Sequence, residues 1–239
     1  GEMIQCNEGD LQWVEREFLD TLPKWEGDQI FLDLLWQDAP FFLLTLRYRN
    51  DALTEAVEKR IRRVPLQYIL GKWEFMGLPF VVNPHCLIPR ADTEHIAEAA
   101  IARKPKRVLD LCTGSGCILA AVLHACPDAT GVAVDLMADA LAVAAENFRL
   151  LGMADRVRFR CGDVRELHFV PEERFDVITA NPPYIAAEEM DTLAPELAAE
   201  PRVALTDGGD GLSLYRAILA NYRGNLTADG VMIVEHGYT

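Results

Sequence analysis

The second half of the chain alternates short apolar segments with helical segments, and this alternation limits the folds that the sequence can adopt. Apolar, β-prone segments bounded by turn residues are typical of buried strands, and they occur at residues 107–111, 130–135, 157–160, 175–180 and 231–235. Helices are predicted at residues 117–125, 138–151 and 213–222. Strands joined through helices need right-handed crossovers, so the sequence predicts an α/β fold with a mostly parallel sheet and helices on both faces.

Residues 1–64 lack this pattern and predict a small helical domain. Apolar residues recur there at helical intervals, as at Leu11, Val14, Phe18 and Leu22, and again between residues 52 and 61. The apolar cluster at residues 41–44 is interpreted as core, with recognition of a partner as the alternative.

Residues 65–86 predict a β-hairpin that links two domains. Aromatic and β-branched residues between positions 67 and 82 are separated there by Gly71, Gly77 and Pro79. The next segment, residues 87–94, opens into an alanine-rich helix, and Asp92 or Thr93 is placed to cap that helix. A loop that ends at a helix N-terminus can also close over a cofactor. Residues 87–239 form the predicted α/β domain.

The charge and the cysteines of the chain exclude some functions. Acidic residues number 37 against 23 basic ones, a formal net charge of −14, which argues against binding to nucleic-acid backbones. No apolar run approaches the ~20 residues of a membrane span, so no membrane segment is expected. The six cysteines form no C-x-x-C pair and have no histidine at zinc spacing. Reduced and mostly buried thiols, no metal and a cytoplasmic location are therefore expected. The protein is also expected to be a monomer.

Acidic residues stand at the carboxyl ends of three of the predicted strands, and a glycine-rich loop accompanies the first of them. The segment 110–116, Asp-Leu-Cys-Thr-Gly-Ser-Gly, permits a tight turn and a close approach of ligand to backbone. Asp110 suits a cationic amino-acid group, Asp135 is positioned for two ribose hydroxyls, and Asp163 can accept from an adenine amino group. These side chains would meet at the carboxyl ends of the strands, so the pattern predicts an adenosine-containing ligand.

The stiff loop Asn181-Pro182-Pro183-Tyr184 follows the fourth predicted strand. Its two prolines fix φ, restrict the residues before them and donate no N–H. The side-chain oxygen of Asn181, beside the Pro182 carbonyl, can accept both hydrogens of a planar NH2 group, and Tyr184 can pack on that group. For this tetrapeptide taken alone, a strand-to-loop exit without any function is the alternative.

Together these motifs resemble the class I S-adenosylmethionine-dependent methyltransferases, and specifically the N5-glutamine methyltransferases that modify peptide chain release factors. The resemblance depends on residues 65–71, 87–94, 110–116, 181–185, 200–201, 210–216 and 235–237. It implies a Rossmann-like class I methyltransferase fold preceded by a small helical domain that helps to engage the protein substrate. It also implies methyl transfer from S-adenosylmethionine to the side-chain amide nitrogen of a release-factor glutamine, with S-adenosylhomocysteine as the product.

The resemblance assigns roles to individual residues. Contacts with the cofactor are implied for Asp110, Cys112, Thr113, Gly114, Ser115, Gly116, Asp135, Asp163, Val164 and Asn181. The substrate glutamine would be held by Asn181, Pro182, Pro183 and Tyr184, of which Asn181, Pro182 and Tyr184 are the expected catalytic residues.

Three positions depart from the pattern of that family. Ala91 stands where a second proline is usual, and Cys112 stands where a glycine is common. The family continues with two more strands beyond the position of Thr239, so we expect C-terminal strands to be missing from this sequence.

Three alternative functions stay open at this point. They are the same chemistry on a glutamine of a ribosomal protein, methylation of an exocyclic amine in DNA or RNA, and a cofactor-binding regulator without turnover. The acidic charge argues against the second alternative, and the intact loop at residues 181–184 argues against the third.

Overall fold

The computed structural model describes residues 51–237 of the chain. The chain divides into two compact units, Gly1–Thr54 and Glu55–Thr239, and the second unit is described below. The helices and the apolar cluster predicted before residue 51 lie outside the described residues, and the predicted domain limits at residues 64 and 86 stay predictions. Helix α2, Asp51–Ile61, agrees with the helical spacing of residues 52–61. None of the helices in residues 51–237 is long and apolar enough to cross a membrane.

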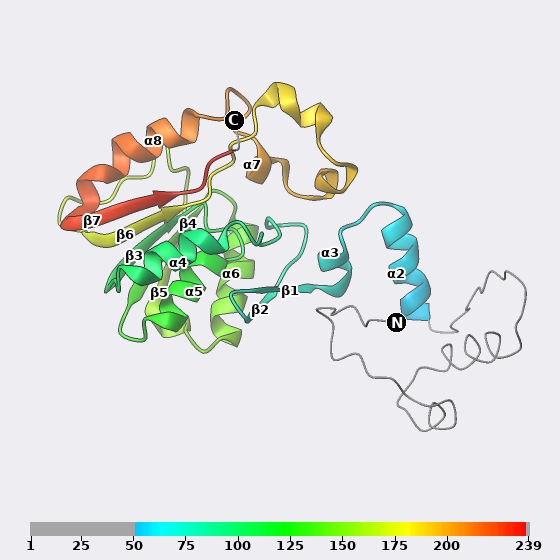
Figure 1. Cartoon of the computed structure of the whole chain (residues 1–239), viewed down its shortest axis with the longest axis horizontal. Helices are drawn as coiled ribbons and strands as arrows, with labels where there is room; N and C mark the ends of the chain where they lie inside the picture. Colours follow the sequence, from blue (N-terminus) through cyan, green and yellow to red (C-terminus); the bar gives the residue numbers. More distant parts are fainter. Residues whose placement is uncertain (1–50, 238–239) are drawn as a thin grey trace, which may run out of the picture. The chain divides into compact units, whose positions relative to one another are not determined.

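The core of the second unit is a parallel sheet with the strand order β5-β4-β3-β6-β7 (Figure 1). Every neighbouring pair in this sheet is parallel, as the alternation of strands and helices predicts. The strands are β3 Arg107–Leu111, β4 Thr130–Asp135, β5 Val157–Cys161, β6 Phe175–Ala180 and β7 Leu226–Val234. This arrangement confirms the predicted α/β fold.

Strand β7 begins five residues earlier than the sequence pattern indicates. It pairs with β6 through Phe175 and Leu226 and then through Val177 and Val231, with a register shift between the two pairs. The polar residues of the resulting bulge interrupt the apolar run that otherwise marks a strand. The sequence pattern therefore detects only the part of β7 after the bulge.

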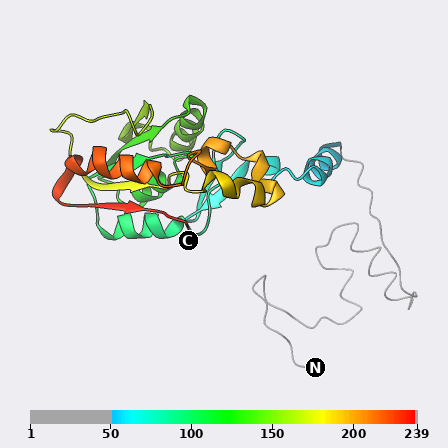
Figure 2. The same ribbon diagram turned by 90° about the horizontal axis from the view of Figure 1, so that it is seen from above.

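Helices cover both faces of the sheet, and successive strand residues point to opposite faces. Val108 packs in one core with α4, α5 and α6, whereas Leu109 packs in a second core that includes Ile218 and Tyr222 of α8. In Figure 2 the strands β6 and β7 lie between α8 and α4. The helices are α4 Glu94–Ala102, α5 Cys117–Ala125, α6 Ala138–Leu150, α7 Arg202–Leu205 and α8 Ser213–Tyr222, with 3-10 turns η2 Ala154–Arg156, η3 Ala187–Thr192, η4 Pro195–Ala199 and η5 Arg223–Asn225.

The segment predicted as a hairpin contains a short helix before its strands. Strands β1 Lys72–Phe75 and β2 Leu78–Val81 form an antiparallel pair, but residues Leu66–Leu70 form helix α3. Their β-strand interpretation was therefore wrong. The Pro65 carbonyl accepts from the N–H groups of Tyr68 and Ile69, and Gly71 ends the helix at a φ of 68°. These end signals outweigh the β-prone composition between them.

The cap predicted for helix α4 does not form. Thr93 occupies the N-cap position, but its backbone is helical (φ −67°, ψ −19°) and its side chain makes no capping hydrogen bond. Capping needs an extended backbone at this position, because only then does the side chain reach the first free N–H groups. Of the five cysteines in residues 51–237, all free, Cys86 and Cys117 are buried, Cys112 and Cys126 are half-buried and Cys161 is exposed. The expectation of mostly buried thiols is thus confirmed for part of them.

Candidate active site

A pocket lies at the carboxyl ends of the parallel strands, where ligands bind in sheets of this kind. The segment before α4 forms one wall, and the segment after β6 forms another. The lining residues fall within the ranges 85–90, 112–118, 135–140, 162–165 and 201–207, together with Thr93, Asn181, Pro183 and Leu214. The segment 87–94 thus takes part in the pocket, in line with its expected place over a cofactor.

The buried side chain of Asp110 stabilises the glycine-rich loop after β3. This side chain is fully buried, and its carboxylate accepts from the Thr113 hydroxyl at 2.5 Å and from the Thr179 hydroxyl at 2.6 Å. Burial raises the pKa of Asp110 to about 6, although both hydrogen bonds act in the opposite direction. Asp110 does not line the pocket. Its hydrogen bond to Thr113 stabilises the conformation of the loop instead.

Positive φ angles allow this loop to turn sharply into α5. Gly116 has a φ of 80°, and a Cβ atom there would lie 2.9 Å from the Phe148 ring, so only glycine fits. Cys112 has a φ of 58°. The common glycine of the resembling family suits such a backbone better, and the cysteine is accommodated here at some strain.

Asp135 at the end of β4 connects the glycine-rich loop to the segment that follows β4. Its carboxylate accepts from the Gly114 N–H at 2.8 Å and from the Met137 N–H at 2.9 Å. Burial raises the pKa of Asp135, against the effect of these N–H groups. Each oxygen keeps a further lone pair, so the side chain can still accept hydroxyl groups from a ligand in the pocket.

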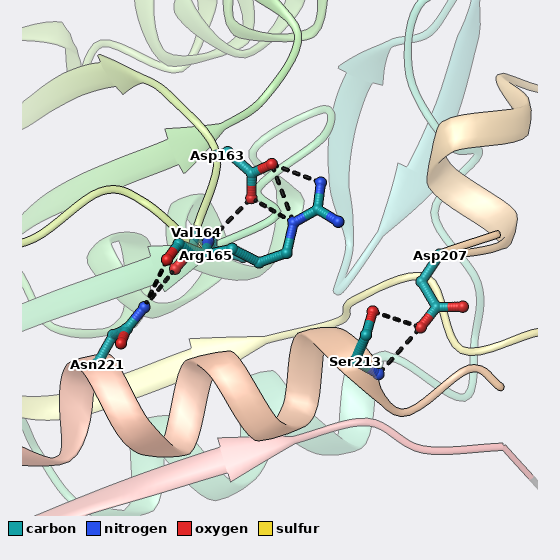
Figure 3. Close-up of polar contacts among 6 residues, drawn as sticks. All are labelled: Asp163, Val164, Arg165, Asp207, Ser213 and Asn221. Carbon is teal, nitrogen blue, oxygen red and sulfur yellow. Dashed lines mark hydrogen bonds and ion pairs between the residues drawn. The ribbon is translucent and has the colours of Figure 1, made fainter. Parts of the chain in front are cut away.

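Asp163 after β5 is held by its neighbour Arg165, as Figure 3 shows. The Arg165 Nε lies 2.9 Å from Oδ1 and 3.0 Å from Oδ2, and a terminal guanidinium nitrogen lies 2.5 Å from Oδ2. Hydrogen bonds from the Arg165 side chain lower the pKa of Asp163. The carboxylate is therefore ionised at neutral pH and fixed in place as a hydrogen-bond acceptor beside the pocket.

Asn181 directly follows β6 and is oriented by Thr93. Its Nδ2 donates to the Thr93 hydroxyl at 3.2 Å, so the hydroxyl predicted to cap α4 serves this amide instead. Within residues 51–237, neither the Asn181 Oδ1 nor the Pro182 carbonyl accepts a hydrogen bond from the protein. Two acceptors at the start of this loop thus have no partner among the described residues.

Tyr184 is packed between the end of β7 and the loop before α8. Its hydroxyl donates to the Glu235 carboxylate at 3.4 Å, and burial, followed by the charge of Glu235, raises the pKa of Tyr184. Gly211, with a φ of 74°, lies so close that a Cβ atom would be 2.2 Å from the Tyr184 carbonyl oxygen. The loop 181–184 is therefore supported from two sides.

The structure brings most of the predicted site residues to one pocket. Those that line it are Cys112, Thr113, Gly114, Ser115, Asp135, Asp163, Val164, Asn181 and Pro183. Those that do not are Asp110 and Gly116, which shape the glycine-rich loop, and Pro182 and Tyr184 of the loop 181–184. The roles of all of them toward a ligand stay predictions.

An ion pair that the sequence analysis missed joins two walls of the pocket. The buried carboxylate of Glu200 accepts from the guanidinium of Arg90 and, at 3.0 Å, from the Ile88 N–H. Both partners lie in motifs that carry the family resemblance, but no pattern within either motif indicates that the two segments meet.

Asp207 is a second residue that the sequence analysis missed. Its carboxylate accepts from the N–H groups of Gly209 and Gly211. It also accepts from the N–H and the hydroxyl of Ser213, as Figure 3 shows. Partial burial opposes the effect, yet the Ser213 hydroxyl and the N–H groups bring the pKa of Asp207 to about 2. The sequence Asp-Gly-Gly-Asp-Gly before a helix is a turn signal that could have pointed to it.

Comparisons with known proteins identify the class to which this fold and pocket belong. The family model described as the methyltransferase small domain matches residues 92–222. The catalytic domain of hMettl16, solved with the MAT2A 3′UTR hairpin 6, has the same fold, with a TM-score of 0.51 and 17% identity over 67% of this chain and 64% of that one. The chain is thus a member of the class I methyltransferases in fold.

Sequence relatives identify the family within this class. The chain is 46% identical over 183 residues to the release factor glutamine methyltransferase of Cereibacter sphaeroides, covering 76% of this chain and 65% of that one. It is 42% identical over 191 residues to the release factor glutamine methyltransferase of Bordetella pertussis, covering 78% and 70%. The chain belongs to the release factor glutamine methyltransferase family, and it spans about two thirds of the length of these relatives.

Proposed function

We propose that this protein transfers a methyl group from S-adenosylmethionine to the side-chain amide nitrogen of a glutamine in a peptide chain release factor. The observation that carries the proposal is the pair of acceptors unpartnered within residues 51–237, Asn181 Oδ1 and the Pro182 carbonyl, beside a pocket that is lined by the strand-end carboxylates Asp135 and Asp163. Family membership supports the substrate, because the relatives are named for this modification.

The pocket residues fit S-adenosylmethionine in shape and charge. Gly114 and Gly116 let a ligand approach the backbone, and the carboxylates of Asp135 and Asp163 suit the hydroxyl and amino groups of an adenosine. The negative charge of the largely buried Asp135 carboxylate in the pocket also favours a cationic ligand over a pyrophosphate. When bound, S-adenosylmethionine supplies an electrophilic methyl group on a sulfonium.

The protein's contribution to the reaction is mainly alignment. A carboxamide nitrogen is a poor nucleophile, because its lone pair is delocalised into the carbonyl. Asn181 and the Pro182 carbonyl bind its two N–H groups, orient the nitrogen and stabilise the positive charge that develops on it. Tyr184 packs on the planar amide. The proton leaves late from a strongly acidic group, so no strong general base is needed.

An Asn181→Ala variant tests this mechanism. Loss of one acceptor should lower methyl transfer at least ~100-fold, while S-adenosylhomocysteine affinity stays within a few-fold of wild type. Transfer is measured with radiolabelled cofactor and affinity by calorimetry. Unchanged turnover would remove Asn181 from the mechanism.

The substrate is tested by offering alternatives side by side. Labelled cofactor is incubated with the protein and, in turn, a release factor, a large-subunit ribosomal protein, DNA and buffer alone. Label should enter the release factor and disappear when its target glutamine is replaced. Label in the ribosomal protein or in DNA would assign the pocket to that substrate instead, and the absence of label in every arm would favour a regulator without turnover.

A further inference from the structure

Asn221, on the last turn of α8, reaches across to the loop that follows β5. Its Nδ2 donates to the carbonyl of Val164 at 3.2 Å and to the carbonyl of Arg165 at 3.0 Å, as Figure 3 shows. Within residues 51–237 these two carbonyls accept no other hydrogen bond. One side chain from a distant helix thus supplies every hydrogen bond that these two carbonyls accept within the described residues.

The same stretch carries a donor and an acceptor on two residues that line the pocket. Val164 and Asp163 both line it. The Val164 N–H makes no hydrogen bond within the described part of the chain, and the Asp163 carboxylate is fixed by Arg165. An adenine edge offers an acceptor nitrogen next to an amino group, which complements this donor and acceptor. A hypoxanthine edge offers the reverse order, and is disfavoured.

We propose that Asn221 is a positioning residue for adenine recognition. Its two hydrogen bonds hold the peptide between Val164 and Arg165, so that the Val164 N–H and the Asp163 carboxylate keep the spacing that adenine requires. The inference rests on the proposed function only in that the ligand contains adenosine. It concerns recognition of the base and is independent of which molecule receives the methyl group.

Asn225 offers a matched control within the same structure. Its Nδ2 also donates to two carbonyls of the same connection, to Val170 at 3.1 Å and to Glu173 at 2.8 Å. Those carbonyls belong to the far end of the connection and do not line the pocket. The two asparagines thus make equivalent bonds, but only one of them holds pocket residues.

The experiment compares two ligands that differ only in the base. Calorimetry gives the affinities of S-adenosylhomocysteine and S-inosylhomocysteine for the wild-type chain and for the Asn221→Ala, Asn221→Asp and Asn225→Ala variants. Asn221→Asp is nearly isosteric and lacks the donor, so it preserves the test if the alanine variant does not fold. Circular dichroism verifies folding.

We expect each Asn221 variant to bind S-adenosylhomocysteine about tenfold more weakly, from the loss of two hydrogen bonds. Binding of the inosine analogue should change much less, so the preference for adenine falls. Asn225→Ala should lower the melting temperature and leave both affinities within about twofold.

Other results would overturn the proposal. An unchanged preference in both Asn221 variants would show that this residue only stabilises the fold, and an equal loss of preference in Asn225→Ala would show that any loosening of the connection has the same effect. No binding by the wild-type chain would overturn this inference and the cofactor assignment together. Normal binding without transfer to a release factor would contradict the proposed function and leave the role of Asn221 standing.

Discussion

The Asn181 amide donates to the Thr93 hydroxyl at 3.2 Å, although the two residues are 88 positions apart in the chain. This contact joins the start of helix α4 to the loop after β6, and it determines which atom of the amide is left to accept. With Nδ2 engaged, Oδ1 is available to a substrate N–H. The orientation of the proposed catalytic amide thus depends on a residue outside the loop 181–184.

Replacing Thr93 should therefore slow methyl transfer. Thr93→Val keeps the shape but removes the acceptor for Asn181 Nδ2, so we expect roughly tenfold slower transfer at saturating substrates, equivalent to one lost hydrogen bond. Thr93→Ser retains the hydroxyl and should keep most of the activity. Single-turnover rates with a release factor measure the difference, and equal rates for the two variants would contradict the role assigned to Thr93.

Gly211 should be intolerant of any side chain. A Cβ atom there would lie 2.2 Å from the Tyr184 carbonyl oxygen at a φ of 74°, so Gly211→Ala should displace the loop 181–184 and lower both melting temperature and transfer. Gly208 is the control, because it has a φ of 78° but no atom within 4 Å of its added Cβ. Gly208→Ala should cost only about 1 kcal/mol of backbone strain. Similar losses of activity in the two variants would argue against the clash.

The buried carboxylate of Glu200 should contribute strongly to stability. Its side chain is 2% exposed and serves both Arg90 and the Ile88 N–H, so Glu200→Ala should lower the free energy of unfolding by about 3 kcal/mol. Glu146 is the control, since its pair with Arg149 is solvent-exposed and Glu146→Ala should change the free energy of unfolding far less than Glu200→Ala. Urea denaturation measures both, and comparable values would refute the importance of this buried pair.

Asp110 should make stability depend on pH in an unusual direction. Burial raises its pKa in the folded protein to about 6 from an ordinary value of 3.8, so the folded state holds this proton more tightly than the unfolded state. The contribution of Asp110 to the free energy of unfolding is on the order of 3 kcal/mol. It is fully present below pH 3.8 and is lost as the pH rises through about 6.

The Asp110→Asn variant isolates this effect. Its free energy of unfolding should fall less than that of the wild type between pH 4 and about pH 6.5, because no carboxylate has to ionise in the core. Denaturation curves at several pH values, with the wild type measured in parallel, provide the comparison. A parallel pH dependence of the two proteins would mean that Asp110 does not carry this proton.

Much of the fold was predictable because its signals are local. The bounds predicted for β3, α5, β4, β6 and α8 agree with the structure. The spacing of apolar residues that indicates a strand or a helix can be recognised within a few consecutive residues. The interpretation failed where end signals compete with composition, as in helix α3, and where a bulge interrupts a strand, as in β7.

The sequence by itself determined the order of strands and helices, the glycine-rich turn and the stiffness of the loop 181–184, because proline and glycine act on their own backbone and immediate neighbours. Only the tertiary structure decided that Thr93 orients Asn181, that Glu200 pairs with Arg90, and that Asn221 holds Val164. These partners are separated by 88, 110 and 57 positions. Such contacts arise from the packing of whole elements, and no local pattern records which distant side chains will meet.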